Sequence, residues 1–404
     1  MHGRGGVERP ACDDSELVLD LLDIFYNGVL LSLLLLWLLS ERPNRFGRLI
    51  SFAKTHSTSL VGVLWALFLT FAVAYCLYFD QLADMHDIPS AVDSAVLSQS
   101  GGVNPYNHDV VPRFEGKYTS PPTWSFGPYN YLSLDLIVYF GIHELAGGLG
   151  MPIWFVAANL MFSAIAFIIL QDMLQVKWRF FAPIAGVAML FYSFDNASLT
   201  FLLIVASMYL YSTLKSNNGS VATIVLGLAI MTKIYAIIPF VVFVMYELQL
   251  RAQLRDWRVF ARVSASVGVS GVVATGLMLP FGIGNVVNSA VLFHLNAGAR
   301  VGTSSGGTFL SELPLSDSMS TIISVALVLI SVIAALRLKS LNNRMLLASL
   351  VLLLVVSKSS QALLVVPGLF LVLRMREAYL ARRALRGEAP APLISLWDVF
   401  KFRT

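Results

Sequence analysis

The sequence predicts an all-α membrane protein with about eleven transmembrane helices, within a range of about nine to thirteen, on three observations. The chain of 404 residues is 57% hydrophobic and only 13% charged, whereas soluble domains carry about 25% charged residues. Several apolar runs approach or exceed the ~20 residues that cross a bilayer. These runs do not alternate with a period of two, which argues against a transmembrane β-barrel.

The apolar segments follow one another along most of the chain. By residue number they are 18–40, 58–79, 151–171, 180–194, 197–213, 220–233, 235–249, 262–282, 318–337, 344–357 and 360–375. Three of them are short for a bilayer crossing, which sets the range on the count. The first is preceded by acidic residues instead of the basic flank of a signal peptide, so we expect it to be retained.

The basic residues predict an orientation, because Lys and Arg mark the cytoplasmic side of short loops. One assignment of the segments across the membrane places all the basic clusters on the cytoplasmic side, with the N-terminus outside and the C-terminus inside. The segments 80–150 and 282–317 then form two outer loops, and 376–404 forms a basic cytoplasmic tail. Segment 129–149 carries Asp135, and we expect an interfacial or re-entrant helix there. We expect residues 1–404 to be one domain, in the plasma or inner membrane.

The first outer loop collects four carboxylates, Asp80, Asp84, Asp87 and Asp93. From Asp87 the pattern predicts a short amphipathic interfacial helix that ends at a pair of glycines, residues 101–102. One interpretation is that Asp87 only caps this helix and Asp80 only marks the water interface. The other is that one of them is a general base at the bilayer surface. The local pattern by itself favours the first.

Other polar residues lie where a membrane makes them costly, and such residues point to function. An aromatic loop spans 117–132 and suits either an interfacial belt or a platform for a sugar ring or an isoprenoid chain. His294 and Arg300 share the second outer loop, where they suit a phosphate or are incidental to a flexible loop. Lys233 and Lys358 interrupt apolar runs, and each suits a substrate phosphate, a neighbouring carboxylate or snorkelling.

The order of these motifs resembles the GT-C glycosyltransferases, most of all the polyprenol-phosphate-mannose-dependent mannosyltransferases. Their first outer loop opens its helix with an Asp and closes with NPY, here Asp87 and residues 104–106. The further similar segments, in order, are Tyr118 with Pro121 and Pro122, the turn SFDNAS at 193–198, Gly227 through Lys233 to Pro239, the set His294, Arg300 and Ser304, and residues 357–367. The resemblance extends over about residues 60–375 and rests on short motifs.

The resemblance implies transfer of a hexose, mannose first of all, from a polyprenyl-phosphate donor to a lipid or glycan acceptor, with inversion, on the outer membrane face. Asp87 would be the general base, with Asp80 as the alternative. The donor phosphate would be held by Arg300, His294, Lys233 and Lys358. The residues expected to line the substrate are Asn104, Tyr106, His108, Tyr118, Trp124, Tyr129, Asp195 and Asn196.

The sequence departs from the family in that two apolar runs, instead of one, precede the loop. We expect neither a metal nor another cofactor, because no D-x-D motif is present. A divalent ion on Asp84, His86 and Asp87 stays an alternative. The expected partners are the donor, the acceptor and membrane lipids, without nucleic acid. Two other classes stay open: a transporter or flippase for a lipid-linked or anionic substrate, and a non-catalytic scaffold.

Overall fold

The fold is known from a computed structural model, and every element it describes is helical, with no β-strand among the described residues. The described residues are 87–110, 128–149, 153–174, 196–213, 218–254, 257–292, 317–355 and 365–385, with residue 186 and short pieces between 56 and 70. The predicted all-α class is therefore confirmed for this part of the chain.

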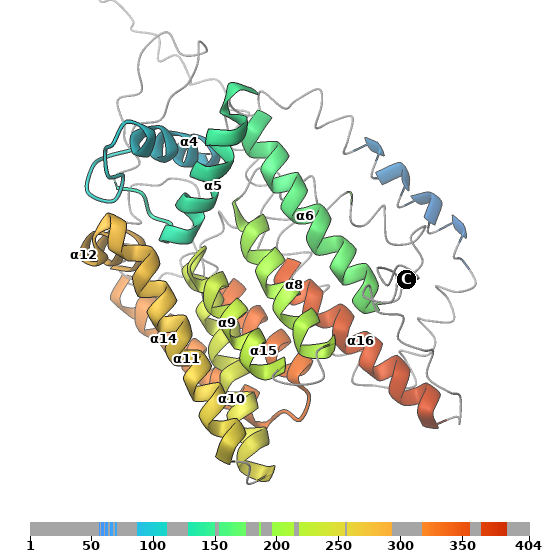
Figure 1. The fold of residues 1–404 in the computed structure, drawn as a ribbon. Helices are drawn as coiled ribbons and strands as arrows, with labels where there is room; N and C mark the ends of the chain where they lie inside the picture. Colours follow the sequence, from blue (N-terminus) through green and yellow to red (C-terminus); the bar gives the residue numbers. More distant parts are fainter. Residues whose placement is uncertain are drawn as a thin grey trace, which may run out of the picture.

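Among the described residues eight long helices run side by side (Figure 1). α8 runs parallel to α6, since their first turns are in contact, and from α8 on each helix reverses the direction of the one before it. They are α6 (Ile153–Leu174), α8 (Ala197–Thr213), α9 (Asn218–Ile230), α10 (Ile237–Leu254), α11 (Trp257–Met278), α14 (Asp317–Arg337), α15 (Leu341–Val355) and α16 (Val365–Leu385). α9 packs against α8, α10 and α11, and α15 packs against α10, α14 and α16. From α8 on, successive connections between these helices therefore lie at opposite ends of the bundle.

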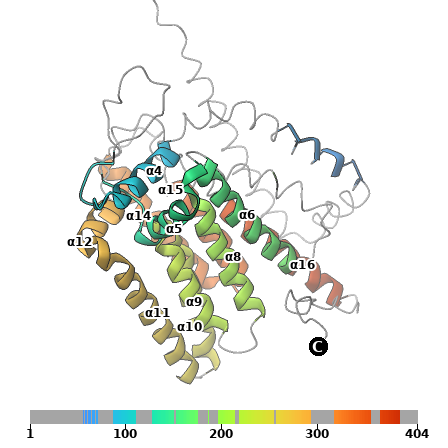
Figure 2. The ribbon, with the colours of Figure 1, turned by 45° about the horizontal axis from the view of Figure 1, so that its top comes forward.

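One end of the bundle is covered by shorter elements, and we name it the α4 end. α4 (Asp87–Ser100) lies across it, next to α5 (Ser133–Ala146), as Figures 1 and 2 show. α11 leads into α12 (Ile283–Val286) there, and the turn between α9 and α10 reaches the same end. We name the opposite end the basic end, where α10 leads to α11, α14 turns into α15, and α16 finishes.

The helix positions agree with the sequence-based segments over most of the described chain. α8 begins and ends where its apolar run does, and the other long helices overlap theirs. α16 continues beyond its apolar segment to Leu385, so the first part of the predicted basic tail is helical. Arg, Ala and Leu are good helix formers, so the basic stretch extends the helix. The segments 18–40 and 180–194 fall outside the described helices.

Among the described residues two helices are long and apolar enough to cross a membrane, Ile153–Leu174 and Phe260–Phe281. The count of about eleven spans stays a prediction. α5 has 14 residues, about 21 Å at 1.5 Å per residue, which is shorter than a bilayer core. α5 begins beside Met231 and ends beside α4, so it stays at the α4 end.

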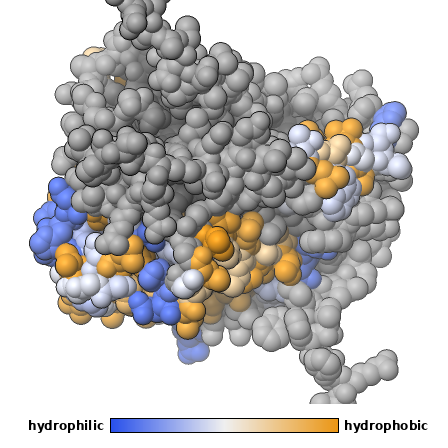
Figure 3. Space-filling model, turned by 90° about the horizontal axis from the view of Figure 1, so that it is seen from above, coloured by the Kyte–Doolittle hydropathy of each residue, from blue (hydrophilic) through white to orange (hydrophobic). Residues whose placement is uncertain are grey.

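The interior of the bundle is mainly apolar, with buried polar side chains among the apolar ones. One cluster of buried side chains joins α6, α8, α9, α10, α15 and α16, and a second lies at the α4 end around Tyr106, Tyr129, Tyr139 and Trp154. Leu202 and Leu203 of α8 pack against both clusters. Hydrophobic side chains also remain on the outside, and Figure 3 shows such patches from the α4 end. An apolar exterior over an apolar interior is the arrangement expected of a membrane bundle.

Candidate functional site

The first part of the candidate site is α4, which begins at Asp87 as predicted. Pro89 occupies its first turn, where a missing backbone N–H costs nothing. After Ser100 the chain turns at Gly102, whose φ of 74° suits glycine, and the Val103 N–H donates to the Ser98 carbonyl at 2.9 Å. Over residues 91–96 both faces are buried, Asp93 and Ser94 included. The sequence predicts an amphipathic helix with an apolar face. In the structure the polar side chains of this stretch are buried as well, because α4 packs among the other elements of the α4 end.

The NPY motif fastens the chain after α4 to the end of α11. The Asn104 side chain donates to the Phe281 carbonyl at 2.7 Å and accepts from the Tyr106 N–H at 3.1 Å. The Pro105 carbonyl accepts from the Tyr129 N–H at 2.8 Å. Three segments that are distant in sequence are therefore joined by backbone and amide groups at this motif.

Lys233 lies at a break in the bundle, between the end of α9 and the start of α10. Its backbone is extended, with φ −141° and ψ 128°, and one turn of 3₁₀ helix, Ile234–Ala236, separates it from α10. Pro239 in the first turn of α10 lacks the donor that a continuous helix needs, which favours a break before it. The Lys233 side chain is 5% exposed, and its Nζ lies 4.9 Å from the Tyr131 ring centroid and 6.0 Å from that of Tyr235. The break thus places the Lys233 ammonium near two aromatic rings.

Asp135 is the centre of the polar groups beside Lys233. It lies in the first turn of α5 and is fully buried. Its Oδ2 accepts from the Tyr129 hydroxyl at 2.6 Å and from the Asn196 amide at 2.9 Å. Two donors on one oxygen suit the carboxylate. The Leu134 N–H donates to the Met231 carbonyl at 3.0 Å, which ties this turn to the segment that carries Lys233.

The tyrosine rings connect Asp135 to Lys233. Tyr129 makes an edge contact with Tyr131 at 5.4 Å between centroids, and Tyr131 is the ring nearest to the Lys233 ammonium. The Tyr106 hydroxyl donates to the Tyr131 carbonyl at 2.9 Å. Burial, and then the negative charge of Asp135, raises the pKa of Tyr106 and Tyr129 well above the ordinary value of 10.0. Both hydroxyls therefore keep their protons and serve as donors.

A buried polar layer supports this cluster from below, and the start of α8 organises it. Asn196 contacts Asp135 of α5, the Ser198 hydroxyl contacts Asn159 of α6, and the Thr200 hydroxyl lies 2.8 Å from that of Thr232. Asn159 also accepts from the Tyr139 hydroxyl at 2.6 Å. Buried hydrogen bonds between separate elements favour one arrangement of those elements. The layer therefore fixes α5, α6, α8 and the α9 turn relative to one another.

The predicted site residues divide between this cluster and the rest of the chain. Asn104, Tyr106, Tyr129, Asn196 and Lys233 come together at the α4 end. His108 follows the NPY motif and is exposed. Asp87 starts α4 at the same end. The remaining predicted residues lie outside the described part of the chain: Asp80, Tyr118, Trp124, Asp195, His294, Arg300 and Lys358.

Sequence reasoning missed Asp135 and Tyr131 as members of the cluster. Asp135 entered only as a reason to doubt that 129–149 crosses a membrane. The signal was present, because a lone carboxylate in an apolar helix must find partners. Those partners, Tyr129 and Asn196, could not be chosen without the fold, since Asn196 lies 61 residues further along the chain.

Metal binding has no support among the described residues, where no group of three or more His, Cys, Asp or Glu side chains could hold an ion. The expectation that no metal is required stays a prediction. In comparisons of the chain with protein-family models, with curated proteins and with solved structures, nothing matched.

Proposed function

We propose that the protein is an integral-membrane glycosyltransferase of the GT-C type, with its reaction site at the α4 end. It would move a hexose, mannose first of all, from a polyprenyl-phosphate donor to a lipid or glycan acceptor. The observation that carries the proposal is the meeting of three separated motifs at one end of the bundle. These are the helix opened by Asp87, the NPY loop and the Lys233 break.

The distribution of charge supports an outer-face site. Among the described residues at the α4 end, Lys233 is the only Lys or Arg. The same end contains the acidic residues Asp87, Asp93, Asp109, Asp135 and Glu144. At the basic end the described Lys and Arg residues include Arg258, Arg262, Arg337, Lys339, Arg344, Arg374 and Arg376. Cytoplasmic loops collect Lys and Arg. We infer that the basic end faces the cytoplasm and the α4 end faces outward, in a plasma or inner membrane.

The proposed reaction is an inverting displacement at the anomeric carbon. Asp87 takes the proton of an acceptor hydroxyl, whose oxygen then forms the new bond to that carbon. The bond from the anomeric carbon to the phosphate oxygen breaks, and the polyprenyl phosphate leaves with its negative charge. A preorganised cation offsets that charge, and Lys233 is suited to this role because its surroundings hold it before the donor binds. Arg300, His294 and Lys358 are proposed to assist on the resemblance alone.

A transporter or flippase is the second candidate, and the break between α9 and α10 favours it. Transporters place ionisable groups at interrupted helices near the bilayer midplane. Here Lys233 lies at the α4 end of the bundle instead of its middle, which supports the transferase more. Flux of a lipid-linked substrate through proteoliposomes, without chemical change, would support the transporter.

The test is transfer of radiolabelled mannose from polyprenyl-phosphate-mannose to a membrane-lipid extract. The wild type is compared with Asp87→Asn and with Asp109→Asn, an exposed aspartate of the same loop. We expect transfer by the wild type and the Asp109 variant, and loss of about a hundredfold or more in the Asp87 variant. Absence of transfer with several donor sugars, or full transfer by Asp87→Asn, contradicts the proposal.

A further inference from the structure

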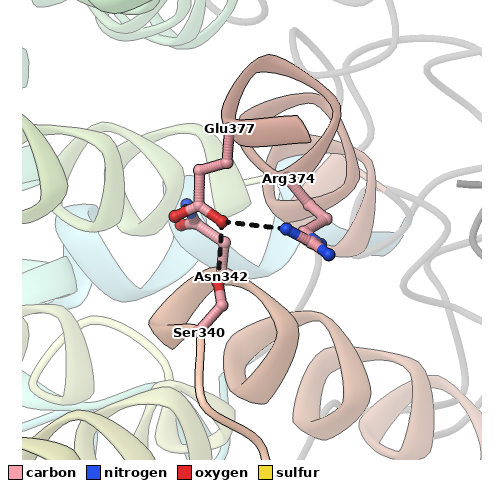
Figure 4. A network of polar contacts seen from close by, with 4 residues as sticks. All are labelled: Ser340, Asn342, Arg374 and Glu377. Atoms are coloured by element: carbon pink, nitrogen blue, oxygen red, sulfur yellow. Dashed lines mark hydrogen bonds and ion pairs between the residues drawn. The ribbon is translucent and has the colours of Figure 1, made fainter. Parts of the chain in front are cut away.

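Two carboxylates of the basic end are bound by other side chains of the protein. Glu247 of α10 is fully buried and accepts from the Tyr211 hydroxyl at 2.7 Å. Glu377 of α16 accepts from Ser340 Oγ at 2.7 Å and from Asn342 Nδ2 at 2.6 Å, and it pairs with Arg374 at 3.5 Å (Figure 4). Their negative charge is therefore used to join α16 to the turn between α14 and α15, and to hold α10.

Arg344 holds together the helices that end here. Its Nε donates to the Leu338 carbonyl at 2.6 Å, and its Nη1 donates to Gln249 Oε1 at 2.7 Å. Its guanidinium lies 5.0 Å from the centroid of the Tyr246 ring. The end of α14 is thereby fixed beside the end of α10, and α11 follows α10 directly.

Four other cations at this end are exposed. Arg258 and Arg262 lie on the first turns of α11, whereas Arg337 and Lys339 lie at the end of α14 and just after it. Because Arg344 joins α14 to α10, and α11 follows α10 directly, both pairs lie near the end of α10. At this end the carboxylates of Glu247 and Glu377 are bound by other side chains, whereas these four cations are exposed to the surroundings.

An apolar surface continues from each of these pairs. The 18-residue window of Phe260–Phe281 is only 11% buried, and Val272 on this helix is 73% exposed. On α14 the side chains of Ile322, Val325, Leu329, Ile330 and Ile333 are all more than half exposed. A cationic end above a long apolar face matches an amphiphile with a negative headgroup.

We propose that the basic end binds an acidic phospholipid, with its phosphate headgroup between the Arg258/Arg262 and Arg337/Lys339 pairs and its acyl chains along α11 and α14. A nucleic acid or an acidic protein segment would neutralise the positive charge but would leave the apolar faces of α11 and α14 uncovered. An acidic phospholipid would cover both, so it fits better. The proposal rests on membrane embedding and goes beyond glycosyl transfer.

The test is native mass spectrometry of the full-length protein in detergent micelles supplied with phosphatidylglycerol or phosphatidylcholine. We expect about a tenfold or greater preference for phosphatidylglycerol, since each Lys or Arg near an anionic lipid contributes about fivefold. Arg258→Gln with Arg262→Gln should remove most of that preference, and so should Arg337→Gln with Lys339→Gln. The matched variant Arg258→Lys with Arg262→Lys keeps the charge and should keep the preference.

Two results overturn the proposal: equal binding of the two lipids by the wild type, and an unchanged preference in both Gln variants. Circular dichroism of each variant distinguishes a lost lipid site from a lost fold. Because no sugar donor is present, the result does not depend on whether the protein transfers mannose.

Discussion

The two ends of the bundle contain the same element, a fully buried carboxylate bound by a tyrosine hydroxyl. At the α4 end Tyr129 donates to Asp135 at 2.6 Å, and at the basic end Tyr211 donates to Glu247 at 2.7 Å. The surroundings differ. Glu247 lies within the unbroken helix α10, whereas Asp135 lies beside an interrupted segment and a cation held among aromatic rings. The comparison teaches that a buried carboxylate in a continuous helix is sufficiently explained by helix packing. A buried carboxylate next to an interrupted helix and a buried cation is the better candidate for a functional site.

The largest expected effect follows from Asp135→Ala. It leaves the Tyr129 hydroxyl and the Asn196 amide without their buried acceptor, so we expect a loss of about 3–5 kcal/mol in unfolding free energy. Denaturant titration in mixed micelles measures this loss. Asp109→Ala, at an exposed position, should change it by less than about 0.5 kcal/mol. Equal losses of unfolding free energy in the two variants would show that the hydrogen bonds of Asp135 do not contribute to stability.

The next effect concerns Gly227 of α9, which lies between the two ends. A Cβ at this position would lie 2.6 Å from the Ser270 side chain of α11, so Gly227→Ala should cost about 1–3 kcal/mol through overpacking. Ser270→Gly removes the clashing atoms and should restore much of the loss in the double variant. Gly268→Ala is the control, because nothing lies within 4 Å of its Cβ. The same titration measures all four variants, and a Gly227→Ala cost matching the control contradicts the close approach of α9 and α11.

Glu247→Gln sharpens the comparison between the ends. The amide oxygen still accepts from the Tyr211 hydroxyl, so we expect a loss of only about 1 kcal/mol in stability, chiefly from the lost charge. Its rate of mannose transfer should equal that of the wild type, because the residue is at the end opposite to the proposed site. A tenfold lower rate in a folded Glu247→Gln protein would remove the distinction between a structural and a functional end.

The smallest effect is a dependence on alkaline pH. Tyr106 and Tyr129 have a raised pKa in the folded state, so the unfolded chain loses these protons first as the pH rises past about 10. Stability is therefore unaffected below pH 10 and falls above it. Unfolding measured from pH 8 to 11 should show this fall, and Tyr129→Phe should reduce its slope. An unchanged slope in Tyr129→Phe would show that Tyr129 makes no contribution.

Much of the helical layout could be predicted from the sequence, because apolar length and charge placement are local signals. The run at 197–213 is α8 residue for residue. The start of α4 at Asp87 and its end before the glycine pair follow from capping chemistry. The apolar segment 360–375 gave no end for α16, which continues into the basic stretch to Leu385, because Arg and Glu both favour helices.

The candidate site was only partly predictable, because its contacts join distant segments. Asn104 is predicted to line a substrate, and its amide donates to the Phe281 carbonyl, 177 positions away. Lys233 stood out as a lone cation in an apolar run, but its aromatic surround depends on Tyr131 of another segment. No local pattern specifies pairings of this kind, which arise only when α5, α8 and α9 pack together.

The most direct test of the proposed site compares two lysines from opposite ends of the bundle, Lys233→Met and Lys339→Met, in the mannose-transfer assay. Lys233 is buried at the α4 end, and Lys339 is exposed at the basic end. We expect Lys233→Met to lower the transfer rate about a hundredfold, because a preorganised cation at the leaving phosphate is lost, and Lys339→Met to leave it unchanged. Equal rates for the two folded variants would contradict a reaction site at the α4 end.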